Sequence, residues 1–124
     1  MRGFSQMGVG STAPGVRFEL EDMRLTGNGD GVYAGRLAAL RVQADGNARY
    51  GIAGLEGDVA QSTATNDGDA GIYVLAGTAV GNQAYLNAHA GMHFGSAVAY
   101  SGNSSMANAP NYRAGGAGSA NASF

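Results

Sequence analysis

The sequence predicts an all-β fold, an antiparallel meander of about five or six strands in a sandwich, barrel or β-prism-like arrangement, with extended N- and C-terminal arms. Three observations lead to this prediction. Apolar residues alternate with small or polar ones, as in strands with one buried face. Asp-Gly pairs and other turn signals separate the alternating runs. Finally, 22 glycines and 23 alanines among 124 residues indicate a folded chain whose side chains fill little space.

The pattern divides the chain into three parts. Residues 1–15 are small and polar, with Pro14 and Gly15 as breakers, and are predicted to form an N-terminal arm. Residues 16–100 carry the alternating pattern and form the predicted β-domain. Residues 101–124 are almost entirely Gly, Ala, Ser and Asn, a composition typical of a flexible tail, and are predicted as a C-terminal arm.

The first strands of the β-domain are expected at 16–20 and 32–44. After 16–20 the apolar residues fall out of phase, and a bulge at Glu21–Asp22 explains the change. The apolar spacing within 32–44 fits either a strand or a short helix, and the flanking turn signals favour the strand.

Later strands are expected at 72–80 and 84–100. The second run alternates over 17 residues, so we expect it to bend or break at Gly91 or Gly95. Tight hairpins between the strands are expected at three Asp-Gly pairs, namely Asp30-Gly31, Asp45-Gly46 and Asp67-Gly68.

A glycine followed by an apolar residue recurs every 20 residues, at Gly31, Gly51, Gly71 and Gly91. A structural unit of that length is expected in a β-solenoid or in an array of similar hairpins. Glycine is so frequent here that unrelated strands of similar length also explain the spacing. The sequence leaves both interpretations open.

The scarcity of bulky side chains predicts association with other chains. Leu, Ile, Val and Phe together number only 21. We expect neighbouring chains to complete the fold through Gly/Ala-rich faces and to cover the edges of the meander, with a homo-oligomer, a trimer in preference, as the result.

Charge and residue types exclude several function classes. Seven arginines, no lysine and nine acidic residues give a net charge of −2, so we expect no nucleic-acid partner, because phosphate binding needs clustered basic residues. The absence of cysteine excludes disulfides, thiolate metal sites and a cysteine nucleophile. No apolar run approaches about 18 residues, so no membrane partner is expected, and no classical secretion signal is present.

The two histidines, His89 and His93, have the spacing of two metal ligands on a helix. The local period of two predicts a strand instead, on which they lie about 13 Å apart, too far to share one ion. In a symmetric trimer each histidine could form a ring of three. We predict two polar residues on the less buried face.

Acidic residues suggest two further kinds of site. One set resembles calcium loops but lacks the complete ligand pattern, so turn formation is expected: Asp30, Asn66, Asp67 and Asp69. A second set could supply paired carboxylates for sugar hydrolysis: Glu19, Glu21, Glu56 and Asp58. Cross-strand ion pairs with nearby arginines are the expected role of this second set, and the candidates are Arg17, Arg24, Arg36 and Arg41.

The sequence therefore predicts a chain that is not an enzyme, with no catalytic residue, no metal site and no cofactor. Tyrosine is the remaining candidate for ligand contact, because its ring can stack on a sugar. The six tyrosines are Tyr33, Tyr50, Tyr73, Tyr85, Tyr100 and Tyr112.

The strings NARYGIAGLEG, GDAGIYVLAG and AHAGMHFGSAVAYSGN resemble Gly/Ala-rich β-segments of bacteriophage virions, especially trimeric tail-fibre segments and small capsid-decoration proteins. The resemblance covers residues 30–100 and carries over no functional residue. It implies a non-enzymatic, homo-oligomeric structural protein of the virion that contacts other virion structural proteins. Similar strings occur in trimeric bacterial adhesins, so the alternative is a glycan-binding adhesin or receptor-binding module at the bacterial cell surface.

Overall fold

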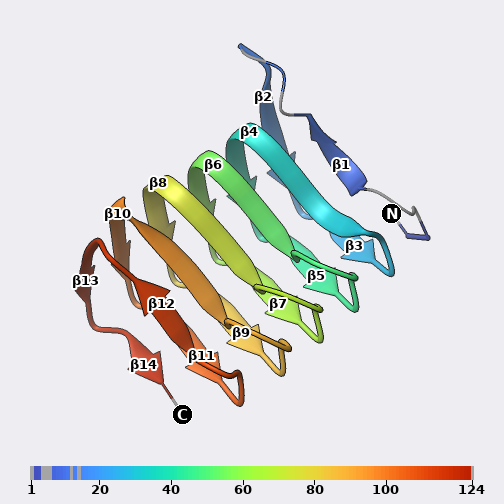
Figure 1. Ribbon diagram of the computed structural model, residues 1–124. Helices are drawn as coiled ribbons and strands as arrows, with labels where there is room; N and C mark the ends of the chain where they lie inside the picture. Colours follow the sequence, from blue (N-terminus) through green and yellow to red (C-terminus); the bar gives the residue numbers. More distant parts are fainter. Residues whose placement is uncertain (1, 4–6, 12, 14, 124) are drawn as a thin grey trace.

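The computed structural model is a β-solenoid of about six coils (Figure 1). It describes residues 2–3, 7–11, 13 and 15–123. The described residues contain no helix that could cross a membrane. The larger sheet has eight strands: β1 (Met7–Ser11), β2 (Arg17–Glu21), β4 (Asp30–Leu40), β6 (Ile52–Ala60), β8 (Ile72–Val80), β10 (Met92–Ser101), β12 (Tyr112–Ala114) and β13 (Ala117–Ser119). The smaller sheet has six: β3 (Arg24–Thr26), β5 (Gln43–Asp45), β7 (Thr63–Thr65), β9 (Gln83–Tyr85), β11 (Ser104–Met106) and β14 (Ala122–Ser123).

The predicted antiparallel meander is wrong, because every described strand pair is parallel. Ile52 of β6 pairs with Val32 of β4 on one side and with Ile72 of β8 on the other, so neighbouring strands come from successive coils. Alternation of apolar and polar residues specifies a strand with one buried face, but it does not specify the direction of the neighbouring strand. The sequence pattern is therefore compatible with both architectures.

None of the three Asp-Gly pairs forms the predicted hairpin: Asp45-Gly46 and Asp67-Gly68 lie at corners of the coil, and Asp30-Gly31 begins β4. Two corners in each coil contain a residue in the left-handed region, with φ between 49° and 66°. One corner follows the long strand, as at Asp22 and Arg41, and the other follows the short strand, as at Gly46 and Asn66. The corner at Asp22 replaces the predicted bulge, and the Asp45-Gly46 pair is a corner rather than a hairpin. At these corners the chain changes direction without reversing against the preceding strand.

Two of the predicted strands are confirmed, at 72–80 as β8 and, shifted by one residue, at 16–20 as β2. The run 32–44 is strand rather than helix, and the corner at Arg41 divides it between β4 and β5.

The single long strand predicted over 84–100 is wrong. β9 ends at Tyr85, Leu86 adopts a positive φ, and β10 begins at Met92. The break therefore extends from Leu86 to Gly91 and includes the first expected weak point. A register shift between Phe94 and Ala97 lies beside Gly95, the second expected weak point.

The 20-residue spacing of glycines is structural. The N–H of Gly51 donates to Ala70 O, and that of Gly71 donates to Ala90 O, so these glycines occupy the same place in successive coils. A Cβ atom on Gly51 would lie 2.7 Å from Gly71 O and 2.3 Å from an Asp67 carboxylate oxygen. Glycine is required at this position because the backbones of adjacent coils leave no room for a side chain.

Both segments predicted as terminal arms contain strands. β1 pairs with β4, β11 pairs with β9, and both β12 and β13 pair with β10. Within the predicted arms, residues 1, 4–6, 12, 14 and 124 lie outside the described residues.

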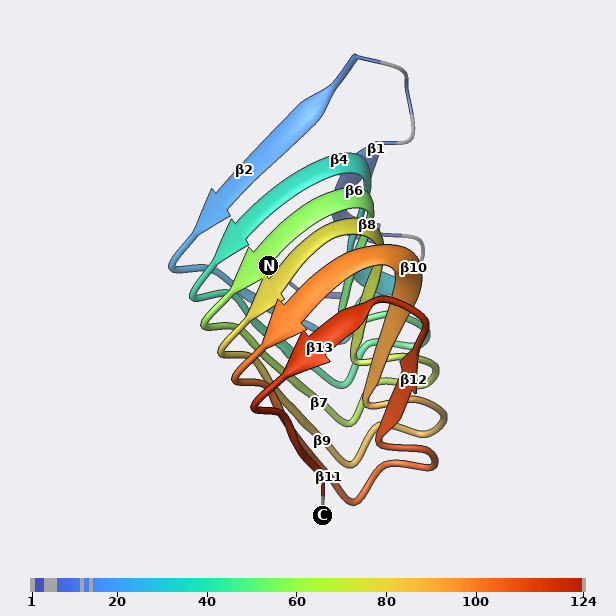
Figure 2. The same ribbon diagram turned by 90° about the vertical axis from the view of Figure 1, so that its left-hand side faces the viewer.

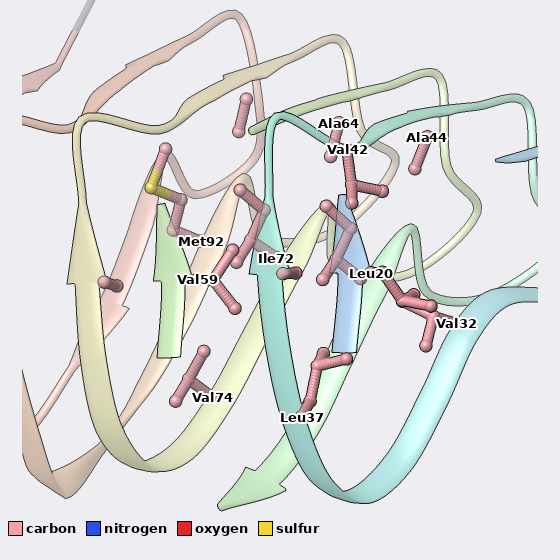
Figure 3. Packing of buried hydrophobic residues seen from close by; sticks show 14 of the residues in the cluster. Leu20, Val32, Leu37, Val42, Ala44, Val59, Ala64, Ile72, Val74 and Met92 are labelled. Carbon is pink, nitrogen blue, oxygen red and sulfur yellow. The ribbon is translucent and has the colours of Figure 1, made fainter. Parts of the chain in front are cut away.

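The long strands arch over the core so that the larger sheet covers two sides of each coil, and the short strands close the third (Figure 2). In β4 the buried hydrophobic residues are Val32 and Ala34, then Leu37 and Ala39. The alternation of buried and exposed residues therefore changes phase between Ala34 and Leu37, where the strand bends. The short strand β3 contributes Leu25 to the core, whereas β5 and β7 contribute the small residues Ala44 and Ala64 (Figure 3).

Adjacent coils of this chain fill the space that the sequence assigned to neighbouring chains. Ile72 and Met92 are fully buried, and each lies against the core residues of the next coil (Figure 3). A core of alanine, valine and isoleucine is continuous along the axis because each coil covers the open side of the one before it.

We expect Gly77→Ala to destabilise the protein by about 3 kcal/mol, because Gly77 has a φ of 128° and a Cβ atom there would lie 2.0 Å from Gly57 O. Gly57, its partner in register, is the matched control, since the nearest atom to an added Cβ lies 3.6 Å away. Urea unfolding of both variants tests this prediction. Equal losses for Gly77→Ala and Gly57→Ala would contradict it.

Candidate functional site

The histidines do not form a shared metal site. His89 lies in the corner before β10, where its Nδ1 is 3.4 Å from Asp69 Oδ1. His93 lies on β10, and its ring packs edge-on against Tyr73 at a centroid distance of 5.0 Å. Among the residues that the structure describes, no group of three His, Asp or Glu side chains could hold a metal ion.

The residues that resemble calcium loops are dispersed and serve different purposes. Asp30 is fully buried and accepts a hydrogen bond from Arg49 at 2.5 Å. Asn66 donates to Asp45 at 3.2 Å. Asp67 is buried in a corner, whereas Asp69 is partly exposed beside His89.

The acidic residues considered as a hydrolytic pair lie on the outer face of the larger sheet. Glu56 lies 3.2 Å from Arg36, and Arg17 lies 3.5 Å from Glu19 and 4.0 Å from Asp58. The expected cross-strand ion pair is confirmed between Arg36 of β4 and Glu56 of β6, whereas Arg17 and Glu19 lie on the same strand, β2. Glu21 likewise pairs with Arg41, and Arg24 lies 3.9 Å from Asp45. Each carboxylate of this set therefore faces an arginine in an open, exposed setting.

Three of the six tyrosines come together with His93 in a stacked column, which we call the aromatic column (Tyr33, Tyr50, Tyr73 and His93). Successive ring centroids lie 5.9, 5.5 and 5.0 Å apart, and all four side chains are half-buried. Ala53 pairs in register with both Tyr33 and Tyr73 and carries only a methyl group. The Tyr50 ring, which enters from the preceding corner, fills this gap.

A polar column (Arg49, Asp69 and His89) runs beside the aromatic column, with one residue from each of three successive coils. The N–H of Asp69 donates to Arg49 O at 2.8 Å, and the N–H of His89 donates to Asp69 O at 3.2 Å. Arg49 directly precedes Tyr50, so the two columns are adjacent. Burial, more than the neighbouring Arg113, lowers the pKa of His93 and so favours its neutral imidazole.

The other tyrosines have separate environments. Tyr85 is exposed on the smaller sheet, and Tyr100 packs on Phe94 at a centroid distance of 4.8 Å. The Tyr112 hydroxyl lies 2.9 Å from Asn103 O.

Sequence reasoning missed two columns of buried asparagines inside the corners. In the first, the N–H of Asn82 donates to Asn103 Oδ1 at 3.0 Å, and the N–H of Asn103 donates to Asn121 Oδ1 at 3.1 Å. The side-chain amide of Asn82 also donates to Val59 O at 2.9 Å. Each asparagine thus bonds both to the next coil and to a backbone carbonyl that a corner leaves unpaired. Asparagines at steps of about 20 residues were the available signal.

The second column contains an aspartate among asparagines: Asn28, Asn47, Asp67, Asn87 and Asn108. Asp67 Oδ1 accepts from the N–H of Asn47 at 2.9 Å and from its side-chain amide at 2.8 Å. In the coils on either side, the asparagine amide donates to a backbone carbonyl, as Asn87 does to Ala64 O at 3.1 Å. An ionised Asp67 has no side-chain proton to donate to a backbone carbonyl in this way. Its Oδ2 is buried and has no hydrogen-bond partner in the part of the chain that the structure describes.

Burial raises the pKa of Asp67 to about 7, although the hydrogen bonds from Asn47 act in the opposite direction. At lower pH the protonated carboxyl can supply the proton that asparagine supplies elsewhere in the column. The negative charge of ionised Asp67 therefore destabilises the folded chain.

Comparison with known proteins gives no relative: no family model, no curated protein and no solved structure matches this chain.

We expect Asp67→Asn to remove a pH dependence of stability. The folded protein holds the Asp67 proton up to about pH 7, whereas the unfolded chain releases it near pH 3.8. The contribution of Asp67 to stability is therefore greatest below pH 3.8, falls as the pH rises to 7, and is level above. The loss amounts to about 4 kcal/mol. Urea unfolding at several pH values should show that the free energy of unfolding of the variant increases relative to that of the native chain as the pH rises. A difference that stays constant between pH 4 and 8 would contradict the assignment.

Proposed function

We propose that the chain is a non-enzymatic structural module, a rigid β-solenoid that joins copies of itself into a larger assembly. The polar groups favour this role. The buried asparagines bond to neighbouring coils, and the exposed carboxylates face arginines. These groups support the architecture and do not converge on a substrate position.

The observation that carries the proposal is the state of the two ends. Among the strands that the structure describes, β1, β2 and β3 at one end and β12, β13 and β14 at the other each pair with a strand on one side only (Figure 1). On the outer side of β3, Arg2 forms a single parallel bridge with Thr26. Strand edges readily pair with another chain. Because all strands run in one direction, the edge at one end of the solenoid is complementary to the edge at the other end of a second copy. Such head-to-tail contacts produce linear assemblies.

The resemblance to bacteriophage appendage segments supports a location in the virion, among other virion structural proteins. The three strings that carry it occupy equivalent places, each running through the corner that precedes β6, β8 or β10 and on into that strand. A repeated coil that lengthens a rod without changing its cross-section suits a fibre or a decoration protein.

We expect Ala114→Pro to reduce self-association. Gly115 donates its N–H to Phe94 O, so the N–H of the preceding residue, Ala114, points away from the solenoid towards an incoming strand. Proline removes that donor. Ala114→Ser keeps the donor at the same exposed position and is the matched control.

Sedimentation equilibrium over a range of concentrations measures the effect. The native chain and Ala114→Ser should gain mass with concentration, and Ala114→Pro should gain less. A fixed mass of three chains would support an oligomer but contradict end-to-end stacking. A native chain that stays monomeric at all concentrations would overturn the proposal.

A further inference from the structure

We propose that the aromatic column and the polar column together form a binding surface for a neutral polysaccharide that lies along the solenoid axis. This role goes beyond the structural function proposed above, because it concerns the side of the rod rather than its ends.

The aromatic column offers stacking surfaces at regular steps. The Tyr33 and Tyr50 rings are tilted by 37° and the Tyr50 and Tyr73 rings by 36°, while His93 meets Tyr73 at 87°. All four residues are half-buried, so part of each side chain remains accessible to solvent. The C–H faces of pyranose rings are apolar and stack on such surfaces, and tyrosine contributes this contact area at a small entropic cost.

The polar column supplies the hydrogen bonds that sugar hydroxyls need. Arg49 offers donors, Asp69 offers acceptors, and His89 lies 3.4 Å from Asp69. The buried Asp30 carboxylate holds the Arg49 guanidinium at 2.5 Å, which fixes its position beside the rings. The surface therefore combines apolar contact with donors and acceptors that are already oriented.

The charge balance favours a neutral ligand over a polyanion. The positive charge of Arg49 is matched by Asp30, and Asp69 places a negative charge in the middle of the polar column. Burial favours the neutral form of His93. A nucleic acid or a sulfated glycan needs several uncompensated basic groups along its path, and this surface does not provide them.

The shape of the surface favours a polymer over a single sugar. The columns follow the exposed edge of successive coils, so each ring contacts only part of a ligand. Several weak contacts at fixed spacing add up for a long chain but not for a monosaccharide. Affinity should therefore increase with the length of the oligosaccharide.

The test is an amide NMR titration of the full chain with cellohexaose, mannohexaose and chitohexaose, alongside glucose, a heparin hexasaccharide and a dT oligonucleotide. We expect at least one neutral hexasaccharide to shift resonances of the aromatic and polar columns, with glucose much weaker. Shifts confined to other faces, stronger binding of heparin or dT, or no shift with any neutral hexasaccharide would overturn the proposal.

Variants at two tyrosines separate binding from folding. Tyr73→Ala should weaken the binding of the active hexasaccharide about tenfold or more, because Tyr73 contacts both Tyr50 and His93 in the column. Tyr85→Ala, which removes the same side chain from an exposed position on the smaller sheet, should leave the affinity unchanged. Thermal unfolding of both variants checks the fold. Equal affinities for the two folded variants would also contradict the proposal.

Discussion

Parallel, in-register pairing between coils is the constraint on which the rest of the structure depends. The amide of Ile52 donates to Gly71 O, and the amide of Ile72 donates to Gly91 O, so the same step of 20 residues recurs from coil to coil. Every position in one coil must therefore tolerate the equivalent position in the next. This requirement explains the glycines at 20-residue steps, the small core residues and the left-handed corners together.

The same constraint makes polar residues useful inside the fold. A corner interrupts the backbone ladder, and an asparagine whose side chain bonds to the next coil restores the missing partners, as Asn103 does between Asn82 and Asn121. Asp67 preserves the geometry but introduces a charge where its neighbours carry an amide. On the outside, the register that stacks core residues also aligns tyrosines into a column. The buried hydrogen bonds and the aromatic column thus derive from one repeat.

The strands could be predicted from the sequence more reliably than their arrangement. Alternation located β8 closely, but it carries no information about the direction of the neighbouring strand. Over 84–100 the alternation in the sequence continues across a corner. Leu86 lies at that corner and is exposed, although the pattern assigned it to the buried face. The tyrosines were candidates from the start. Their convergence depends on Tyr50, which fills the gap at Ala53 from a corner. Its contacts with Tyr33 and Tyr73 join residues of different coils, which only the three-dimensional register brings together.

Duplication of a complete coil tests the central claim most directly. A second copy of residues 71–90 inserted after Ala90 should add one coil, lengthen the solenoid by about 4.8 Å, and leave the free energy of unfolding in urea unchanged or higher. A second copy of residues 71–80, half a coil, should lower that free energy sharply because it shifts every later residue out of register. If the 20-residue insertion destabilises the protein as much as the ten-residue insertion, the coils are not interchangeable units and the account is wrong.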